Sequence, residues 1–466
     1  MLNRRPVLLG IGATMLASLV RAEDNSIAGT WTGVLEAGSQ RLRLKFEIAA
    51  DGTLKLYSLD QGGTPIAGRA KSLTPEKVEL EVGAVRGTFR GRLVSPERIE
   101  GTWHQVADLP LVLMRGEAGF TAAAKSADVL TKDSIEALRR EGNAPALAAA
   151  AVINGKAAQK WVAGERAAGS GVLATVNDQW HLGSITKSMT ATLIARLAEA
   201  GAVSLNEKVG DLLKSVAPDM HQAYKSVTFR HLLCHRAGLT NNIPMEQFAK
   251  FPRESTDVRE DRRGYARIAL GTPPIGPKES TFSYANNGFV VAGAMLEAKL
   301  DRTWEELIQA HLFAPLKLAS AGFGAPGSKG ELSQPAGHAF DGKSHIAMRV
   351  GEGISDNPQV MGPAGRVHMS MNDMLMYLHA HSDGPFLEHE SRRFLHTPPF
   401  GGDYAMGWIV RPTGELWHNG SNTLWYAEVL FNPATGLAAV AAANEGQPGT
   451  ASVVGKALLG AAQAFR

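Results

Sequence analysis

The chain has 466 residues, of which 44% are hydrophobic and 20% are charged, and its formal net charge is +3. A net charge this close to zero gives no argument for nucleic acids or anionic membranes as partners, and we expect none of the former; the composition is typical of globular domains with full cores. At this length we expect two or three domains, and the single cysteine, Cys234, excludes an intramolecular disulfide.

The N-terminus has the pattern of a targeting segment. Arg4 and Arg5 precede an apolar run at 7–20, and Val20-Arg21-Ala22 ends it with small residues at the offsets of a cleavage site. This order is typical of a secretory signal peptide, so we predict that residues 1–22 are removed. An uncleaved anchor is the alternative, although the run is short for a transmembrane helix. We therefore expect a periplasmic or secreted bacterial protein without a transmembrane helix when mature, with Sec and Tat export both open.

Residues 23–116 alternate between apolar and polar side chains with a period of two. The alternation is clearest at 42–48 and 87–93, and Asp51-Gly52 provides a typical turn. This pattern predicts short antiparallel strands, about eight in number, which suit a small closed up-and-down barrel. We find no catalytic group of residues here. We expect a stabilising or positioning role for this domain, with ligand binding in the barrel mouth as the alternative.

An Ala/Gly-rich linker is predicted at 117–125, followed by a larger domain at 126–466. Its expected elements are a helix at 134–140, a hairpin of strands at 146–154 and 159–164, a helix at 186–200, strands at 426–431 and 437–443, and a helix from 450. Because strands at both ends enclose a helical middle, we expect one antiparallel sheet shared by the two ends and covered by helices. The fold class is therefore α+β.

The start of the 186–200 helix brings together a serine and a lysine. Ser184 and Lys187 are three residues apart, which places both side chains on one helical face. A serine hydroxyl is a poor nucleophile at neutral pH, but a buried lysine has a lowered pKa and can accept its proton. The alternative is a helix-capping serine beside a solvated lysine.

Two later segments favour the catalytic interpretation. Tyr284 and Asn286 form a Tyr-x-Asn pattern, and His418-Asn419-Gly420 forms a His-x-Gly pattern in a strand-like run. The order and spacing of the three motifs resemble the serine β-lactamase and penicillin-binding-protein superfamily. The similarity is strongest to its class C-like branch, which includes β-lactamases, D-amino-acid peptidases and carboxylesterases.

Further segments carry the same resemblance. Residues 231–239, His-Leu-Leu-Cys-His-Arg-Ala-Gly-Leu, are similar to a family segment that has Thr-Ser in place of Arg236-Ala237. Residues 362–366, Gly-Pro-Ala-Gly-Arg, are similar to a family turn. The resemblance covers roughly 126–466. It implies an antiparallel sheet flanked by helices plus an all-helical subdomain, with the nucleophile where the two parts meet.

The resemblance also implies roles for individual residues. Ser184 would be the nucleophile, with Lys187 and Tyr284 relaying its proton, and which of those two accepts it first is left open. Asn286 would donate from its amide to Lys187 or to a substrate carbonyl, and Asn287 is the adjacent alternative. Gly420 would allow close approach of substrate. The backbone N–H groups of Ser184 and Ser421 would form an oxyanion hole.

His418 is a departure from β-lactamases, whose corresponding motif begins with a lysine. A histidine is mostly neutral at pH 7, so we expect weaker binding of a substrate carboxylate. The predicted function is an exported serine hydrolase that forms an acyl-enzyme on ester or amide bonds, of the carboxylesterase or D-amino-acid peptidase/amidase type. The alternatives are a β-lactamase and a slowly acylating penicillin-binding module.

No cofactor or metal is expected. His231, Cys234 and His235 have a spacing that suits zinc, but no acidic ligand follows in the manner of a zinc-protease motif. The predicted partner is a small-molecule or short-peptide substrate. Residues 241–277, which are charged and contain Pro and Gly, are expected to shape its pocket.

Overall fold

The structure is a computed structural model that describes residues 26–37, 40–58, 65–105, 108–116, 128–156, 158–352 and 354–465. The predicted signal peptide at 1–22 and the predicted linker at 117–125 lie outside these described residues. Within the described ranges, no helix combines the length and apolarity needed to span a bilayer.

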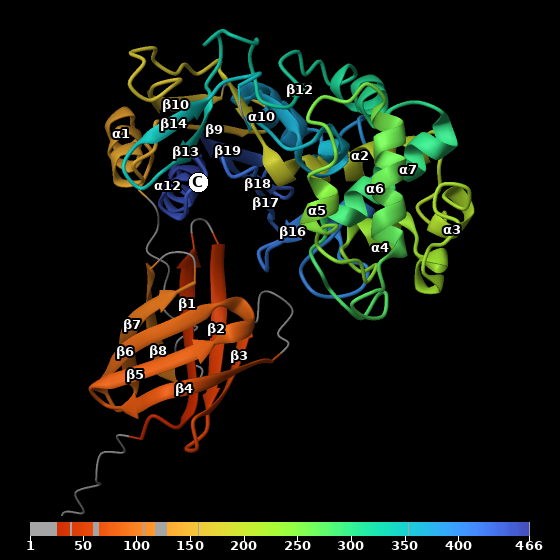
Figure 1. The fold of residues 1–466 in the computed structure, drawn as a ribbon. Helices are drawn as coiled ribbons and strands as arrows, with labels where there is room; N and C mark the ends of the chain where they lie inside the picture. The colour runs from red at the N-terminus through yellow and green to blue at the C-terminus, as the bar shows by residue number, and fades with distance from the viewer. Residues whose placement is uncertain are drawn as a thin grey trace, which may run out of the picture.

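The N-terminal strands close into the predicted eight-stranded antiparallel barrel, in which successive strands pair and the first strand also pairs with the last (Figure 1). Its strands are β1 (Gly29–Ala37), β2 (Gln40–Ile48), β3 (Thr53–Ser58), β4 (Ile66–Thr74), β5 (Lys77–Val82), β6 (Gly87–Ser95), β7 (Arg98–His104) and β8 (Asp108–Arg115). Large side chains fill the interior: Trp31, Phe46 and Phe89 are 0% exposed and Trp103 is 2% exposed. This packing favours a stabilising role for the barrel over ligand binding inside it.

The second part of the chain is built on a six-stranded antiparallel sheet with the order β10-β9-β19-β18-β17-β16. Its strands are β9 (Ala146–Ile153), β10 (Gln159–Gly164), β16 (Ile409–Val410), β17 (Leu416–Ser421), β18 (Tyr426–Asn432) and β19 (Leu437–Ala443). The early strand β9 pairs with the late strand β19 along its length. The predicted sheet shared by the two ends is therefore confirmed.

Helices cover both faces of this sheet (Figure 1). On one face, Leu147 and Ala149 of β9 pack with α1 (Lys132–Glu141) and α12 (Pro448–Gln463). On the other face, Ala148 and Ala150 belong to the core that contains α2 (Thr186–Glu199) and α10 (Met371–His379). Both faces are apolar because successive side chains of a strand point to opposite sides, and both sides are covered.

The all-helical part lies beside the sheet, with α2 between them (Figure 1). Its other helices are α3 (Val209–Leu212), α4 (Phe229–Leu233), α5 (Met245–Phe248), α6 (Val258–Gly271), α7 (Asn286–Leu300), α8 (Trp304–Ile308), α9 (Gly362–Gly365) and α11 (His389–His396). The small strands are β11 (Gln179–His181), β12 (Gly322–Phe323), β13 (Gly337–Phe340), β14 (His345–Met348) and β15 (Val367–Ser370).

The central helix α2 is buried on nearly all sides, whereas its sequence predicts one apolar face. The reason is that its hydroxyl side chains find internal partners. Thr190 Oγ1 donates to the Pro363 carbonyl at 2.7 Å, and Thr192 Oγ1 donates to the Ser188 carbonyl at 2.9 Å. Buried polar groups that are satisfied in this way carry little penalty. These bonds tie the buried hydroxyls of α2 to its own backbone and to that of Pro363.

Candidate active site

Ser184 lies on a short 3₁₀ turn at Gly183–Ile185, directly before α2. It is half-buried, while its neighbours from 181 to 190 are buried. Gly183 adopts a φ of +49°, which disfavours a residue with a side chain. A Cβ on Gly420 of β17 would lie 2.0 Å from the Leu182 carbonyl oxygen and 2.5 Å from Ser184 N. Gly420 is therefore needed for the turn to pack against β17, and its predicted role in the approach of substrate stays a prediction.

A buried ion-pair network supports this turn from behind. His181 Nδ1 accepts a hydrogen bond from Gly183 N at 3.1 Å, and His181 Nε2 lies 3.2 Å from Asp356 Oδ2. Arg366 Nε donates to the same carboxylate at 3.1 Å. Burial raises the pKa of the Asp356 carboxyl, but its contacts with His181 and Arg366 outweigh this effect and hold the pKa well below its ordinary value. The carboxylate is charged at neutral pH, and Arg366 is engaged with it.

Lys187 is fully buried, and its Nζ makes three contacts. Nζ lies 2.9 Å from Ser184 Oγ, 2.7 Å from Asn286 Oδ1 and 2.8 Å from the Ala364 carbonyl oxygen on α9. Burial lowers the pKa of Lys187 well below its ordinary value. A neutral amine has two N–H bonds and one lone pair. Because the two carbonyl oxygens can only accept, the lone pair is left for the hydroxyl of Ser184.

Tyr284 completes the group around Ser184. Its ring centroid lies 5.0 Å from Lys187 Nζ. Burial raises the pKa of Tyr284 well above its ordinary value, although a hydrogen bond with Ser184 opposes the rise. The phenol is therefore protonated at neutral pH and is able to donate. The structure brings the predicted Ser184, Lys187 and Tyr284 into one cluster.

The two adjacent asparagines at the start of α7 have different surroundings. Asn286 Oδ1 accepts from Lys187, and Asn286 Nδ2 donates to Asn242 Oδ1 at 2.9 Å. Asn287 is buried, where it accepts from Tyr265 and donates to Thr240. Asn286 is thus the member of the cluster, as predicted, but toward Lys187 it accepts where the sequence analysis expected it to donate.

His418 on β17 does not present a free nitrogen to a substrate. It is 1% exposed; its Nδ1 donates to the Asn419 carbonyl at 2.6 Å, and its Nε2 accepts from the Tyr404 hydroxyl at 2.9 Å. Burial and the nearby Lys187 lower the pKa of His418 to about 3. His418 is therefore neutral, as predicted. It cannot donate even a weak hydrogen bond to a substrate carboxylate, because its single N–H already donates to the Asn419 carbonyl.

The backbone amides of Ser184 and Ser421 are predicted to form an oxyanion hole. Both lie where the 3₁₀ turn at Gly183–Ile185, the nucleophile turn, packs closely against β17. A Cβ on Gly420 would lie 2.5 Å from Ser184 N, and a Cβ on Gly183 would lie 2.3 Å from Ser421 N. Ser421 is exposed, and its hydroxyl donates to the Trp425 carbonyl at 2.7 Å. The side chain of Ser421 is therefore held within its own loop, and its backbone amide lies beside Gly183, the residue that precedes Ser184.

Tyr404 is a member of the cluster that the sequence analysis missed. It is 4% exposed, and its ring centroid lies 4.5 Å from that of His235 and 6.2 Å from that of Tyr284. In the sequence, Tyr404 is recognisable only as a tyrosine three residues before Gly407-Trp408, and no spacing rule connects it to the other motifs.

The histidines of the 231–239 segment serve structural contacts. His231 is linked to Thr228 and Glu279, and His235 Nδ1 accepts from Ala285 N at 3.0 Å. Burial raises the pKa of the Cys234 thiol to about 12. Within the described ranges, no group of three His, Cys, Asp or Glu residues is arranged to hold a metal ion.

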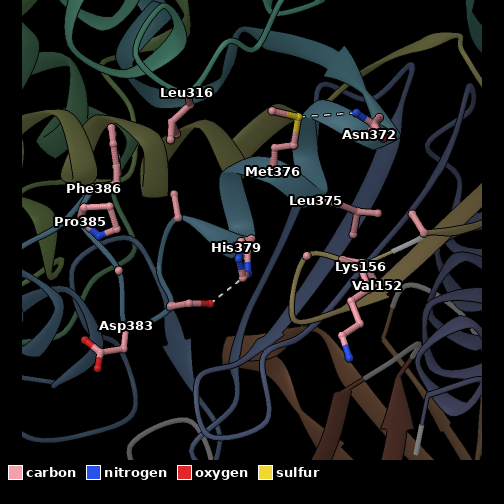
Figure 2. Close-up of a pocket in the computed structure, with 15 residues that line it drawn as sticks. Val152, Lys156, Leu316, Asn372, Leu375, Met376, His379, Asp383, Pro385 and Phe386 are labelled. Atoms are coloured by element: carbon pink, nitrogen blue, oxygen red, sulfur yellow. Dashed lines mark hydrogen bonds between the residues drawn. The ribbon is translucent and has the colours of Figure 1, made fainter.

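A separate cavity of about 360 Å³ lies at the other end of α2 (Figure 2). Leu375, Met376 and His379 of α10 line it, together with Lys156 and Phe386. Phe386 stacks on Arg196 in the last turn of α2, whereas Ser184 precedes the first turn. Fourteen helical residues separate the two places, or roughly 20 Å along the axis. This cavity is not part of the Ser184 cluster.

Comparison with known proteins adds the following findings. A model of the β-lactamase family matches residues 131–463. Penicillin-binding protein 4 of Amycolatopsis lactamdurans is 25% identical over 259 residues, which are 54% of this chain and 63% of that protein. The chain covers 54% to 64% of the length of the first curated relatives that it matches.

Two solved structures illustrate the likeness in fold. A D-stereospecific amidohydrolase from Streptomyces sp. superposes with a TM-score of 0.56 at 22% identity, covering 70% of this chain and 97% of that chain. EstCE1, described as a hydrolase with promiscuous acyltransferase activity, superposes with a TM-score of 0.58 at 17% identity, covering 70% of this chain and 97% of that chain. The predicted β-lactamase-like fold is confirmed by these matches.

Proposed function

This chain belongs to the β-lactamase family of serine hydrolases, and we propose that it hydrolyses ester or amide bonds through an acyl-enzyme on Ser184. The observation that carries the proposal is the contact of 2.9 Å between Lys187 Nζ and Ser184 Oγ, with two carbonyl oxygens occupying the N–H bonds of the amine. A buried amine with its lone pair directed at a hydroxyl is the arrangement needed to activate a nucleophile.

The geometry supports Lys187 as the proton acceptor. Ser184 Oγ attacks the substrate carbonyl carbon while its proton moves to Lys187 Nζ, and the carbonyl oxygen becomes an oxyanion. In this proposal Tyr284, which stays protonated at neutral pH and shares a hydrogen bond with Ser184, donates its own proton to the leaving group and is reprotonated from Lys187. Water then attacks the acyl-enzyme by the reverse path and releases the acid.

The oxyanion formed in each step needs donors that are already in place. The backbone N–H groups of Ser184 and Ser421 supply them, because Gly183 and Gly420 allow the nucleophile turn and β17 to approach closely. Preorganised donors of this kind contribute about 2.7–4 kcal/mol each in other hydrolases. A side chain at position 420 would separate these two amides.

The surroundings of the site favour a neutral acyl group over a β-lactam. A β-lactam antibiotic carries a carboxylate that a cation must hold. Here His418 is neutral and enclosed, and Arg366 is paired with Asp356. The names of two structural neighbours, an amidohydrolase and the hydrolase EstCE1, agree with ester or amide substrates. The likeness to a penicillin-binding protein makes slow acylation by β-lactams the second candidate function.

Substrate preference tests this proposal directly. We expect kcat/KM near pH 7 to be higher for a nitrophenyl ester or a D-amino-acid amide than for a chromogenic cephalosporin. A charge-assisted hydrogen bond is worth about 1.5–3 kcal/mol, so its absence lowers kcat/KM for the cephalosporin by roughly tenfold to a hundredfold. Purified protein comprising residues 23–466 is suitable for the assay. A clear preference for the cephalosporin would overturn the proposal in favour of a β-lactamase.

The pH dependence separates Lys187 from His418. The neutral amine is the active form, so kcat/KM falls with a single proton as the pH decreases through the pKa of Lys187. His418, with its pKa near 3, stays neutral throughout that range. We therefore expect the acidic limb of the kcat/KM profile to have the same midpoint in the wild type and in His418→Gln. A limb that disappears in the variant would show that His418 titrates during catalysis.

A further inference from the structure

Tyr404 contacts a residue of each later motif of the candidate site. Its ring packs on His235 and Tyr284, and its hydroxyl donates to His418 Nε2 at 2.9 Å. We propose that Tyr404 is a positioning residue, which anchors His418 through its hydroxyl and holds the Tyr284 phenol in place for proton donation to the leaving group. This inference rests on the proposed function, since it concerns the same reaction.

The segment that carries Tyr404 is fixed to the nucleophile helix. Gly407 has a φ of +77°, and a Cβ there would lie 2.7 Å from Ser188 Cα and 2.8 Å from the Lys187 carbonyl oxygen. Gly407 N donates to the Leu233 carbonyl, and Ala405 N donates to the Trp408 carbonyl at 2.8 Å. The turn at 404–408 therefore packs directly on the backbone that carries Lys187, which sets the position of Tyr404 relative to the base.

The hydrogen bonds of His418 fix both its ring orientation and its tautomer. The Asn419 carbonyl can only accept, so Nδ1 carries the proton and Nε2 must accept from Tyr404. Tyr404 is the donor in that contact and remains protonated, because burial raises the pKa of its phenol well above the ordinary value. Removing the hydroxyl would leave a buried acceptor without a partner and release one side of the ring.

The His418 ring, which would lose this hydrogen bond, lies next to Tyr284. The His418 and Tyr284 centroids lie 6.4 Å apart, and His235, at 4.3 Å from Tyr284, closes the other side of the phenol. Because a misplacement of about 1 Å can lower a rate by about 10²-fold, a shift of the phenol affects the step that uses it. Attack by Ser184 depends on Lys187, whose three contacts do not include Tyr404.

Leaving-group dependence provides the test. Tyr404→Phe keeps the ring and removes the hydroxyl. A nitrophenolate leaves without a proton, whereas an alkoxide or an amine requires one. We expect kcat/KM of Tyr404→Phe to fall about tenfold for an ethyl ester or an amide and less than twofold for the nitrophenyl ester of the same acid. In protein labelled with ¹⁵N-histidine, the His418 Nε2 resonance should shift to that of an unbonded acceptor, while Nδ1 stays protonated.

Tyr265→Phe is the matched control, because it removes a buried hydroxyl that donates to Asn287 at 2.8 Å, away from His418. It should leave both the leaving-group ratio and the His418 resonance unchanged. An equal loss on both esters in Tyr404→Phe, or an unchanged His418 signal, would assign Tyr404 a structural role and overturn the proposal. If wild-type protein hydrolyses neither ester, the proposed function fails, and the ¹⁵N measurement still decides whether Tyr404 anchors His418.

A second pair of variants keeps the test independent of the folding of Tyr404→Phe. His418→Gln retains an oxygen that accepts from the Tyr404 hydroxyl, whereas His418→Leu offers none. We expect His418→Leu to show the tenfold loss confined to the poor leaving groups and His418→Gln to recover most of it. Identical behaviour of the two variants would contradict the anchoring role.

Discussion

Replacing Ser184 with alanine should abolish hydrolysis of every ester and amide substrate while leaving the fold intact. The hydroxyl is the atom that forms the acyl-enzyme, and its removal from serine hydrolases costs about 10³-fold or more in kcat. The change deletes one half-buried oxygen, so the packing of α2 is unaffected. Steady-state kcat on a nitrophenyl ester, with circular dichroism of both proteins, measures the effect.

Ser204→Ala is the matched control, because Ser204 is an exposed serine outside the cluster. It should retain wild-type activity. A Ser184→Ala variant that keeps more than a tenth of the wild-type rate on every substrate would show that another nucleophile operates.

The second large effect is expected at Lys187. Lys187→Arg replaces the neutral amine with a guanidinium, which does not deprotonate in proteins, so the variant loses the proton acceptor. Its larger head also cannot keep the contacts with Ser184 Oγ, Asn286 Oδ1 and the Ala364 carbonyl oxygen. We expect kcat/KM to fall by about 10²- to 10⁴-fold, the contribution typical of general acid–base catalysis.

Lys214→Arg is the corresponding control, since Lys214 is exposed on the surface. Single-turnover measurements separate acylation from the later steps, and the loss should appear in acylation. If Lys187→Arg acylates within tenfold of the wild-type rate, Tyr284 or a water molecule is the acceptor and the assignment of the base is wrong.

The parts of the fold that the sequence predicted are those set by local patterns. Barrel strands β1 to β8 pair in sequence order, so alternation and turns were sufficient to predict these pairings, whereas closure was expected from the number of strands and is made by the distant pair β1 and β8. The pairing of β9 with β19 is distant in sequence, but it followed from strand-like segments at the two ends of one domain. The burial of α2 on nearly all sides could not be predicted from its serines and threonines, because partners such as the Pro363 carbonyl are contributed by remote backbone.

In the candidate site, too, local spacing was predictable from the sequence and contacts with remote segments were not. The helical spacing of Ser184 and Lys187 predicted their contact, but not the Ala364 carbonyl that orients the amine. Asn286 and Asn287 are adjacent in sequence, and only the start of α7 decides which one faces Lys187. Tyr404 belongs to no spacing pattern, because its role arises from the packing of its turn on α2.

The central claim is that Ser184 forms a covalent acyl-enzyme, and mass spectrometry of the trapped intermediate tests it most directly. The protein is mixed with an activated nitrophenyl ester, quenched in acid within the first turnover and digested. We predict that the acyl group is found on the peptide containing Ser184, in near-stoichiometric amount, and that it is absent from Ser184→Ala treated in the same way. An acyl group on a different residue, or active enzyme that releases nitrophenol without any modified peptide, would contradict the account.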